Sequence, residues 1–204
     1  MSVFSKLVAV ALALPILVDS TALLPRQDVN TTCADIHYFE ARGTTLSYPG
    51  SLITIIDPLM EAFPRSNYAD IVYPATDETG SDSYFQGVAN GAKQISEYAQ
   101  SCPEAKIVLL GYSQGAMVLG DILAGGGDNG ILGNLTQPSI ASSTVGQHTK
   151  QLAAFNLYAD RVHDYCNYHD GVCDARGTGN LTAHMAYPSD YDTEAVAWLE
   201  SMLH

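Results

Sequence analysis

A single serine stands between two glycines directly after an apolar run in this chain. Residues 111–115, Gly-Tyr-Ser-Gln-Gly, fit the G-x-S-x-G pattern, and the serine is Ser113. A serine hydroxyl becomes a nucleophile when a histidine takes its proton and an acid orients that histidine. In hydrolases with this pattern, the serine sits on a sharp turn between a strand and a helix. Ser113 is therefore the candidate nucleophile, although the two glycines also suit an ordinary tight turn.

The candidate acid and base come after Ser113, because hydrolases with this motif carry them in that chain order. Asp170 lies inside the stretch Cys166–Cys173, where a disulfide would hold its carboxylate in place. His184, in NLTAHMAYP, follows this stretch and is the candidate base. The other downstream histidines precede the acids, adjoin cysteines or end the chain: His148, His163, His169 and His204. Neighbouring aspartates suit solvated charges better: Asp160, Asp164 and Asp174. Spacing alone leaves a structural role for Asp170 and His184 equally open.

Alternating strands and helices are expected to bring these residues together. The apolar runs predict strands at residues 34–43, 69–75 and 106–113. Apolar residues at helical spacing predict helices at residues 51–63, 81–102, 114–123 and 192–203. Pro58 is expected to strain or break the first helix, and Asp192 or Thr193 to cap the last one. This alternation predicts an α/β fold with a central parallel sheet covered by helices on both faces.

The N-terminus has the pattern of a secretory signal. Lys6 precedes an apolar run at residues 7–18, and Ser20-Thr21-Ala22 offers the small residues that signal peptidase accepts. The run is shorter than the roughly 20 residues that a membrane-spanning helix needs. We therefore expect a signal peptide at residues 1–22, a leader or flexible segment at 23–32, one domain at 33–204, and a secreted, extracellular protein.

Composition and charge restrict the partners. The 204 residues are 47% hydrophobic and 15% charged, which is typical of one globular domain, and the formal net charge is −13. Such a surface repels phosphate backbones and anionic lipid, so we expect a neutral substrate and no nucleic-acid or membrane partner. We also expect a monomer. Three sequons are open to glycosylation in a eukaryotic secretory pathway: Asn30, Asn134 and Asn180.

The four cysteines allow three disulfide connectivities, and an oxidising compartment favours two disulfides. They are Cys33, Cys102, Cys166 and Cys173. The alternative is a zinc module, because two histidines flank one of them in HDYCNYHDGVC; its ligands would be His163, Cys166, His169 and Cys173. Secretion argues against zinc, and we expect no metal and no cofactor.

Four motifs in this order resemble the cutinase and acetylxylan esterase family, carbohydrate esterase family five: EARGTT, GYSQGA, CNYHDGVC and TAHMAY. The resemblance runs from about Cys33 to the C-terminus and implies a small, lidless α/β-hydrolase-type sandwich. It implies the catalytic residues Ser113, Asp170 and His184. It implies an oxyanion hole at Thr44 and Gln114, and the disulfide pairs Cys33–Cys102 and Cys166–Cys173.

The resemblance also implies a carboxylic ester hydrolase that works through an acyl-enzyme. The expected substrates are acetyl or short-chain acyl esters of plant cell-wall polysaccharide, or cutin-type polyester. Polar residues beside His184, in GTGNLTAHMAY, favour short acyl chains. The alternative is a secreted scaffold that has lost catalysis and acts by binding.

One segment departs from the family pattern. Family members carry a further core strand and a long loop before the Cys166–Cys173 stretch, and this chain is shorter there. Either residues 151–158 supply the strand, or residues 153–162 form a helical lead and the sheet lacks one core strand. The apolar residues in this segment do not alternate as in a strand, which favours the second interpretation.

Overall fold

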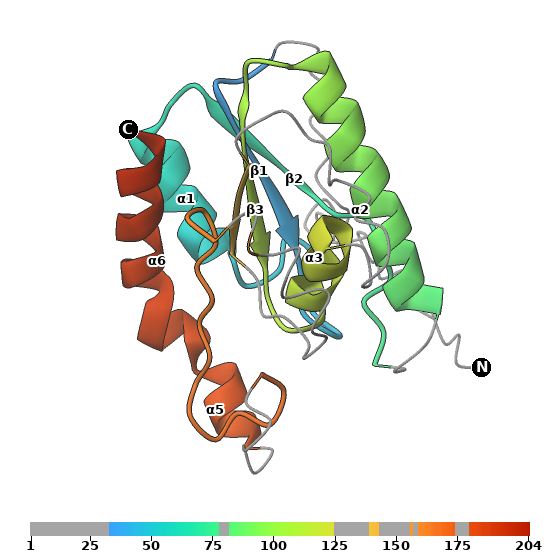
Figure 1. Cartoon of the computed structure of the whole chain (residues 1–204). Helices are drawn as coiled ribbons and strands as arrows, with labels where there is room; N and C mark the ends of the chain where they lie inside the picture. The colour runs from blue at the N-terminus through green and yellow to red at the C-terminus, as the bar shows by residue number, and fades with distance from the viewer. Residues whose placement is uncertain (1–32, 78–81, 125–138, 143–155, 157–158, 174–179) are drawn as a thin grey trace, which may run out of the picture.

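The structure is a computed structural model, and it describes residues 33–77, 82–124, 139–142, 156, 159–173 and 180–204 (Figure 1). The expected signal peptide and leader, the sequons at Asn30 and Asn134, and His148 lie outside these residues. So does most of the segment 151–158. No helix in the described part of the chain is long and apolar enough to cross a membrane.

A parallel sheet forms the centre of the domain. Its strands are β1 (Ile36–Ala41), β2 (Ser66–Asp70), β3 (Lys106–Gly111) and β4 (Ser139–Ser142), in the order β2-β1-β3-β4. All three pairings are parallel. Because β1 and β3 are the two central strands, their carboxyl ends lie side by side, and this is the edge where ligands bind in open α/β sheets.

Helices cover both faces of the sheet. The longer helices are α1 (Ile53–Ala62), α2 (Asp82–Ser101), α3 (Gln114–Ala124) and α6 (Tyr187–Leu203), and a short helix α5 spans Leu181–Met185. Helices α2 and α3 lie on one face, and α1 and α6 lie on the other (Figure 1). This is the predicted α/β architecture.

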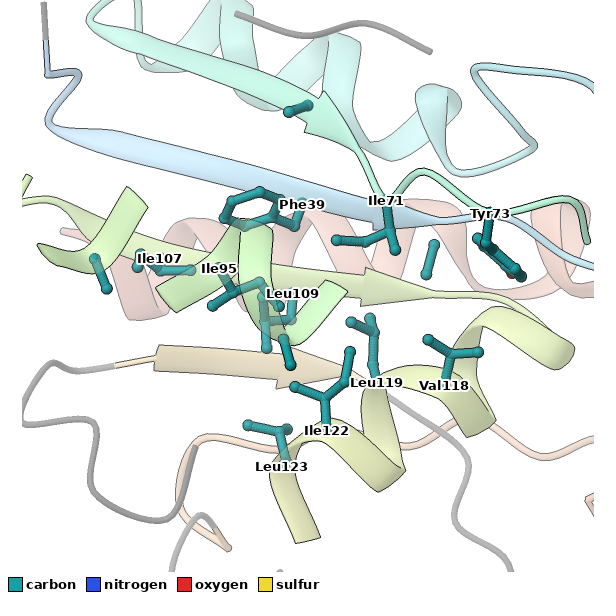
Figure 2. Close-up of a cluster of buried hydrophobic side chains, with 14 of the residues drawn as sticks. Phe39, Ile71, Tyr73, Ile95, Ile107, Leu109, Val118, Leu119, Ile122 and Leu123 are labelled. Carbon is teal, nitrogen blue, oxygen red and sulfur yellow. The ribbon is translucent and has the colours of Figure 1, made fainter. Parts of the chain in front are cut away.

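The side-chain alternation of the strands explains the two layers. In β3, Ile107 and Leu109 pack toward α2 and α3, whereas Val108 and Leu110 pack toward α1 and α6. Both pairs are almost wholly buried. Figure 2 shows the first cluster, where Ile95 of α2 and Leu119 and Ile122 of α3 meet the sheet. A strand that is buried on both faces has a continuous apolar sequence, and this pattern allowed β3 to be predicted.

Several predicted boundaries were wrong. The second strand lies at 66–70 rather than 69–75, because the register with β1 pairs Ile36 with Ser66 and Glu40 with Asp70. The buried residues that suggested a later strand, Ile71 and Tyr73, continue past the ladder into the core. Helix α1 continues through Pro58 without a break.

The C-terminal region also departs from the prediction. Helix α6 begins at Tyr187, with a proline in its first turn, and not at a cap formed by Asp192 or Thr193. Strand β4 was not predicted, because Ser-Ile-Ala-Ser is short and half polar. The described residues beyond β4 contain no further strand, only a single bridge residue at Val162. Of the expected helical lead at 153–162, the described residues are 156, in a 3-10 turn, 159–161, in turns, and the bridge residue Val162, and the rest lies outside the described part of the chain.

Two disulfides link the described cysteines in the expected pairs. Cys33–Cys102 joins the start of β1 to the end of α2, and Cys166–Cys173 closes a short loop. Because all four sulfur atoms are in disulfides, the alternative zinc module has no thiolate ligands.

Candidate active site

Ser113 lies on the turn between β3 and α3, and its backbone φ is +54°. Left-handed backbone is uncommon outside glycine, and such strain clusters at functional sites. The flanking glycines allow the chain to pack closely at this turn. A Cβ on Gly115 would lie 1.8 Å from the carbonyl oxygen of Ala41, and one on Gly111 would lie 2.8 Å from the backbone nitrogen of Ala116. The turn therefore depends on both glycines of the motif and presents the serine above the end of β3.

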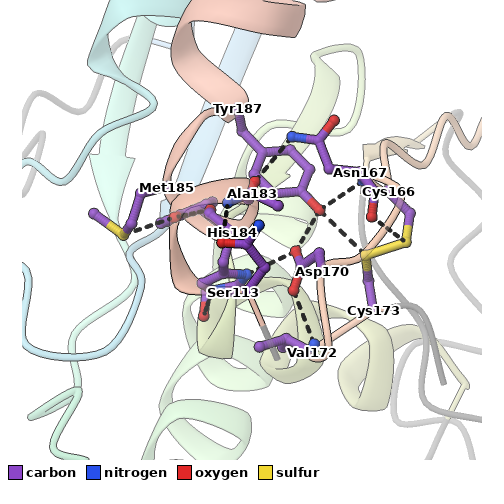
Figure 3. Close-up of polar contacts among 12 residues, drawn as sticks. Ser113, Cys166, Asn167, Asp170, Val172, Cys173, Ala183, His184, Met185 and Tyr187 are labelled. Atoms are coloured by element: carbon purple, nitrogen blue, oxygen red, sulfur yellow. Dashed lines mark hydrogen bonds and ion pairs between the residues drawn. A yellow bond between two sulfur atoms is a disulfide. The ribbon is translucent and has the colours of Figure 1, made fainter. Parts of the chain in front are cut away.

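Three side chains form a continuous hydrogen-bonded chain at this edge (Figure 3). The Oγ of Ser113 lies 2.9 Å from Nε2 of His184, and Nδ1 of His184 lies 2.8 Å from Oδ2 of Asp170. A neutral imidazole with its proton on Nδ1 satisfies both contacts, since it donates to the carboxylate and accepts from the serine hydroxyl. The structure thus brings together the three residues that the sequence proposed as nucleophile, base and acid.

His184 is carried by the five-residue helix α5, which the sequence did not reveal. The side chain of Asn180 caps this helix by accepting from the N–H groups of Thr182 and Ala183, at 3.0 and 3.4 Å. The hydroxyl of Tyr112 donates to the carbonyl oxygen of His184 at 2.6 Å, and the two rings stack with centroids 5.5 Å apart. An asparagine before the segment was the available signal for this helix.

Asp170 is fully buried in the Cys166–Cys173 loop. Its Oδ1 accepts from the N–H of Val172 at 2.8 Å, and its Oδ2 accepts from the hydroxyl of Tyr187 at 2.6 Å as well as from His184. Burial raises the pKa of Asp170, but the hydrogen bonds from Tyr187, His184 and Val172 outweigh it and hold the pKa below its usual value. Asp170 is therefore ionised beside His184 at neutral pH.

Tyr187 is a site residue that the sequence analysis missed. It follows His184 by three residues and begins α6, so its ring lies edge-on to both Tyr112 and His184, with centroids 5.9 and 6.0 Å away. No spacing rule marks such a residue, because its role depends on where the Asp170 loop meets the start of α6.

The two expected oxyanion-hole residues flank the serine turn. Gln114 is the first residue of α3, so its N–H has no partner within the helix. Its buried side chain donates to the carbonyl oxygen of Thr76 at 2.9 Å, which fixes the start of the helix. Thr44 lies in the turn after β1, and a Cβ on the preceding Gly43 would meet the Tyr112 ring at 2.7 Å. The turn that carries Thr44 therefore packs beside the turn that carries Ser113.

Arg42 anchors the loop that carries Thr44. Its buried guanidinium donates from Nε to the carbonyl oxygen of Leu46 at 2.7 Å and from Nη2 to that of Tyr73 at 2.5 Å. It also lies over the ring of Tyr48, 3.7 Å from the centroid. These contacts join the loop after β1 to the segment after β2.

An apolar pocket adjoins Ser113 and His184, between the sheet and helices α1 and α6. Its volume is about 70 Å³, several times the roughly 10–15 Å³ that one water molecule requires. Its apolar walls are Leu52, Ile55, Leu110, Ala195, Trp198 and Leu199. The pocket can hold a small apolar group next to the serine.

His163 and His204 lie away from this chain of hydrogen bonds. His163 stacks on Tyr165 and its Nε2 lies 4.0 Å from a carboxylate oxygen of Glu194. His204 packs on Phe63, with ring centroids 5.2 Å apart. Neither contacts Ser113.

A serine on the turn after a central parallel strand, joined to a histidine and a buried aspartate, defines the class of α/β-hydrolases. Comparison with known proteins narrows this class. The model of the cutinase family matches residues 32–203, and the chain belongs to the cutinase family.

Curated relatives and solved structures agree with this membership. The chain is 35% identical over 190 residues to "Cutinase 11" of Verticillium dahliae, covering 89% of this chain and 62% of that protein. It is 32% identical over 222 residues to "Acetylxylan esterase" of Hypocrea jecorina, covering 91% of this chain and 71% of that protein. A solved acetylxylan esterase structure superposes with a TM-score of 0.68 at 28% identity, covering 85% of this chain and all of that one. These homologues indicate a carboxylic ester hydrolase.

Proposed function

We propose that this chain is a secreted serine esterase that hydrolyses carboxylic esters through an acyl-enzyme. The observation that carries the proposal is the chain of hydrogen bonds from Ser113 through His184 to Asp170, at 2.9 and 2.8 Å. Relatives named cutinase and acetylxylan esterase support the reaction class. The two disulfides and the apolar N-terminal run support secretion.

In the first half of the reaction, His184 takes the proton of Ser113 as Oγ attacks the ester carbonyl. Asp170 stabilises the imidazolium that forms, while the N–H of Gln114 and the Thr44 turn stabilise the oxyanion. The imidazolium then gives its proton to the alcohol oxygen, the carbon–oxygen bond of the ester breaks, and the acyl group stays on Ser113.

In the second half, His184 takes a proton from water, and the resulting hydroxide attacks the acyl carbon. The bond to Oγ breaks, Ser113 recovers its proton from the imidazolium, and the carboxylic acid leaves. His184 therefore carries every proton transfer in both halves of the reaction, and Ser113 ends the cycle in its starting state.

The pocket beside Ser113 supports an acyl group of a few carbon atoms as the part of the substrate bound by the protein. We therefore propose acetyl or short-chain acyl esters of plant cell-wall polysaccharide as substrates, with cutin-type polyester as the other candidate. A net charge of −13 suits a neutral ester better than an anionic one.

Ser113→Ala tests the proposal. Hydrolysis of p-nitrophenyl acetate and butyrate is expected to fall by more than about a thousandfold, because the nucleophile and its partners act as a unit. Ser201→Ala is the matched control, since this exposed serine of α6 bonds only the carbonyl oxygen of Trp198 in the described structure, and its turnover should equal that of wild type.

Two outcomes would contradict the proposal. One is Ser113→Ala retaining wild-type turnover. The other is folded wild-type protein that neither cleaves these esters nor reacts with a fluorophosphonate probe, which would favour the binding scaffold. Release of acetate from acetylated xylan, compared with release of monomers from cutin, then separates the two substrate candidates.

A further inference from the structure

We propose that Tyr187 is a positioning residue for the reaction, because its hydroxyl holds the carboxylate of Asp170 in place and shares one carboxylate oxygen with His184. The inference rests on the proposed esterase function. Figure 3 shows the two donors converging on Oδ2: the hydroxyl of Tyr187 at 2.6 Å and Nδ1 of His184 at 2.8 Å.

The direction of the Tyr187 hydrogen bond follows from its neighbours. The hydroxyl oxygen accepts from the N–H of Asn167 at 3.0 Å, so its single proton is free to be donated. Sγ of Cys173 lies 3.1 Å away, but a disulfide sulfur is a weak acceptor beside a buried carboxylate. Burial and the nearby charge of Asp170 raise the pKa of Tyr187, so it stays protonated and donates to Asp170.

This contact orients the carboxylate in the plane that His184 needs. Val172 fixes Oδ1 through its N–H at 2.8 Å, and Tyr187 fixes Oδ2 from the side of α6. With both oxygens held, the carboxylate cannot rotate away from Nδ1 of His184. The first residue of α6 thus helps to position Asp170, although the sequence motifs of the triad include no residue of this helix.

The hydroxyl also limits how strongly Asp170 attracts a proton on the imidazole. Two donors on one oxygen divide its negative charge, since each bond neutralises part of it. If the hydroxyl were absent, His184 would alone bond Oδ2, and the protonated imidazole would be favoured more. The carboxylate would itself lose one of the bonds that keep it ionised. Both effects reduce activity at the acidic end of the pH range.

Tyr187→Phe tests the inference, because it removes the hydroxyl and keeps the ring that packs on Tyr112 and His184. We expect kcat for p-nitrophenyl butyrate to fall about tenfold, the scale of one hydrogen bond to a charged group, with KM unchanged. We also expect the acid limb of the pH profile of kcat/KM to move to higher pH. If Tyr187 only packed against its neighbours, the substitution would leave the acid limb of the pH profile in place and would not lower kcat selectively over KM.

Tyr191→Phe is the matched control. Tyr191 lies one turn further along α6, and its hydroxyl donates to Oδ1 of Asn167 at 2.8 Å, so it touches the same loop without touching Asp170. This variant is expected to keep the wild-type acid limb. Equal acid limbs in wild type and both variants, with ester hydrolysis intact, would overturn the inference and leave the esterase assignment standing. Absent hydrolysis in wild type would instead overturn the assignment.

A second substitution keeps the test decisive if Tyr187→Phe does not fold. Replacement of Tyr187 by a fluorotyrosine preserves the shape and makes the hydroxyl a stronger donor. The acid limb is then expected to move in the opposite direction, to lower pH. A shift to higher pH, or an unchanged limb, would contradict the role of the hydroxyl.

Discussion

At the scale of single residues, the backbone of Ser113, the proposed nucleophile, is held in a strained conformation by the fold. A serine at φ +54° costs about 1–3 kcal/mol relative to relaxed backbone. The close approach of Gly115 to Ala41 and the fixed start of α3 at Gln114 hold the chain in this conformation. The hydroxyl is consequently placed before any substrate arrives.

Glu40 is a second residue in an unusual state, at the carboxyl end of β1. It is almost wholly buried, and its Oε1 accepts from the N–H of Leu52 at 3.1 Å, just before α1 begins. Burial, together with the nearby charge of Asp70, raises the pKa of Glu40 to about 8 despite the hydrogen bond from Leu52 and the charge of Arg42. The folded protein therefore keeps this carboxyl protonated near neutral pH.

Glu40→Gln should make stability less dependent on pH. Between its ordinary pKa of 4.5 and its folded pKa of about 8, Glu40 binds a proton only in the folded state. The stabilising contribution is therefore present below pH 4.5 and is lost as the pH rises to about 8. Glutamine cannot ionise and keeps the acceptor for Leu52. Thermal unfolding from pH 4.5 to 8.5 should show a smaller fall in Tm for the variant than for wild type.

Glu61→Gln is the control for this measurement, because Glu61 is an exposed residue of α1. The Tm of the Glu61→Gln variant should change with pH as the Tm of wild type does. Parallel curves for wild type and Glu40→Gln would show that Glu40 does not carry the pH dependence.

The three residues of the proposed triad could be named from the sequence, and the structure places their side chains together, whereas the residues that support them could not be named. Ser113, Asp170 and His184 stand in local motifs whose chemistry restricts residue type and order. Tyr187 contacts Asp170, and Glu40 contacts Leu52, and each contact joins two different elements or loops. The spacing of residues along the sequence does not reveal such contacts. Their assignment therefore required the structure.

At the scale of elements, the proposed acid and the proposed base each lie in a short structural element. Asp170 lies in the Cys166–Cys173 loop, and His184 lies in the five-residue helix α5. A helix this short is not stable alone, so α5 depends on its Asn180 cap and on the contact between Tyr112 and His184. The geometry of the site is thus sensitive to these two units.

Removal of the short disulfide, by Cys166→Ser with Cys173→Ser, should reduce activity more than stability. The closed loop is short, so its chain-entropy contribution is only roughly 2.5 kcal/mol. Loss of the bridge frees the backbone around Asp170, and ester turnover per folded molecule should fall by at least about tenfold. Circular dichroism should report a folded protein. Unchanged turnover would show that other contacts suffice to place Asp170.

Long apolar elements were predictable and short ones were not. Strand β3 is a nearly continuous apolar run, and helices α2 and α3 have apolar residues at helical spacing over most of their length. Strand β4 and helix α5 have four and five residues, too few to show a period. Strand β2 was displaced because its register is set by pairing with β1, which the local pattern does not determine.

At the scale of the whole molecule, removal of the Cys33–Cys102 disulfide should reduce stability more than activity, which is the opposite of the expectation for Cys166–Cys173. It spans 69 residues and joins the start of β1 to the end of α2. Cys33→Ser with Cys102→Ser should lower the free energy of unfolding by roughly 4 kcal/mol. Urea unfolding measures this loss. Turnover per folded molecule at 25 °C should match wild type, and a large loss of turnover would contradict the expected independence of this bridge from the site.

Because the strands of the sheet are parallel, the amino ends of the strands lie at one end of the domain and the carboxyl ends lie at the other. Strands β1 and β3 run in parallel, as Figure 1 shows. They begin at the end where the Cys33–Cys102 disulfide lies, and they finish at the end where Ser113, His184 and Asp170 meet. We therefore expect loops at the second end to tolerate changes in length and sequence better than the strands do. On the proposed function, such changes are expected to alter ester specificity while the pairing of β1 with β2 and β3 stays the same.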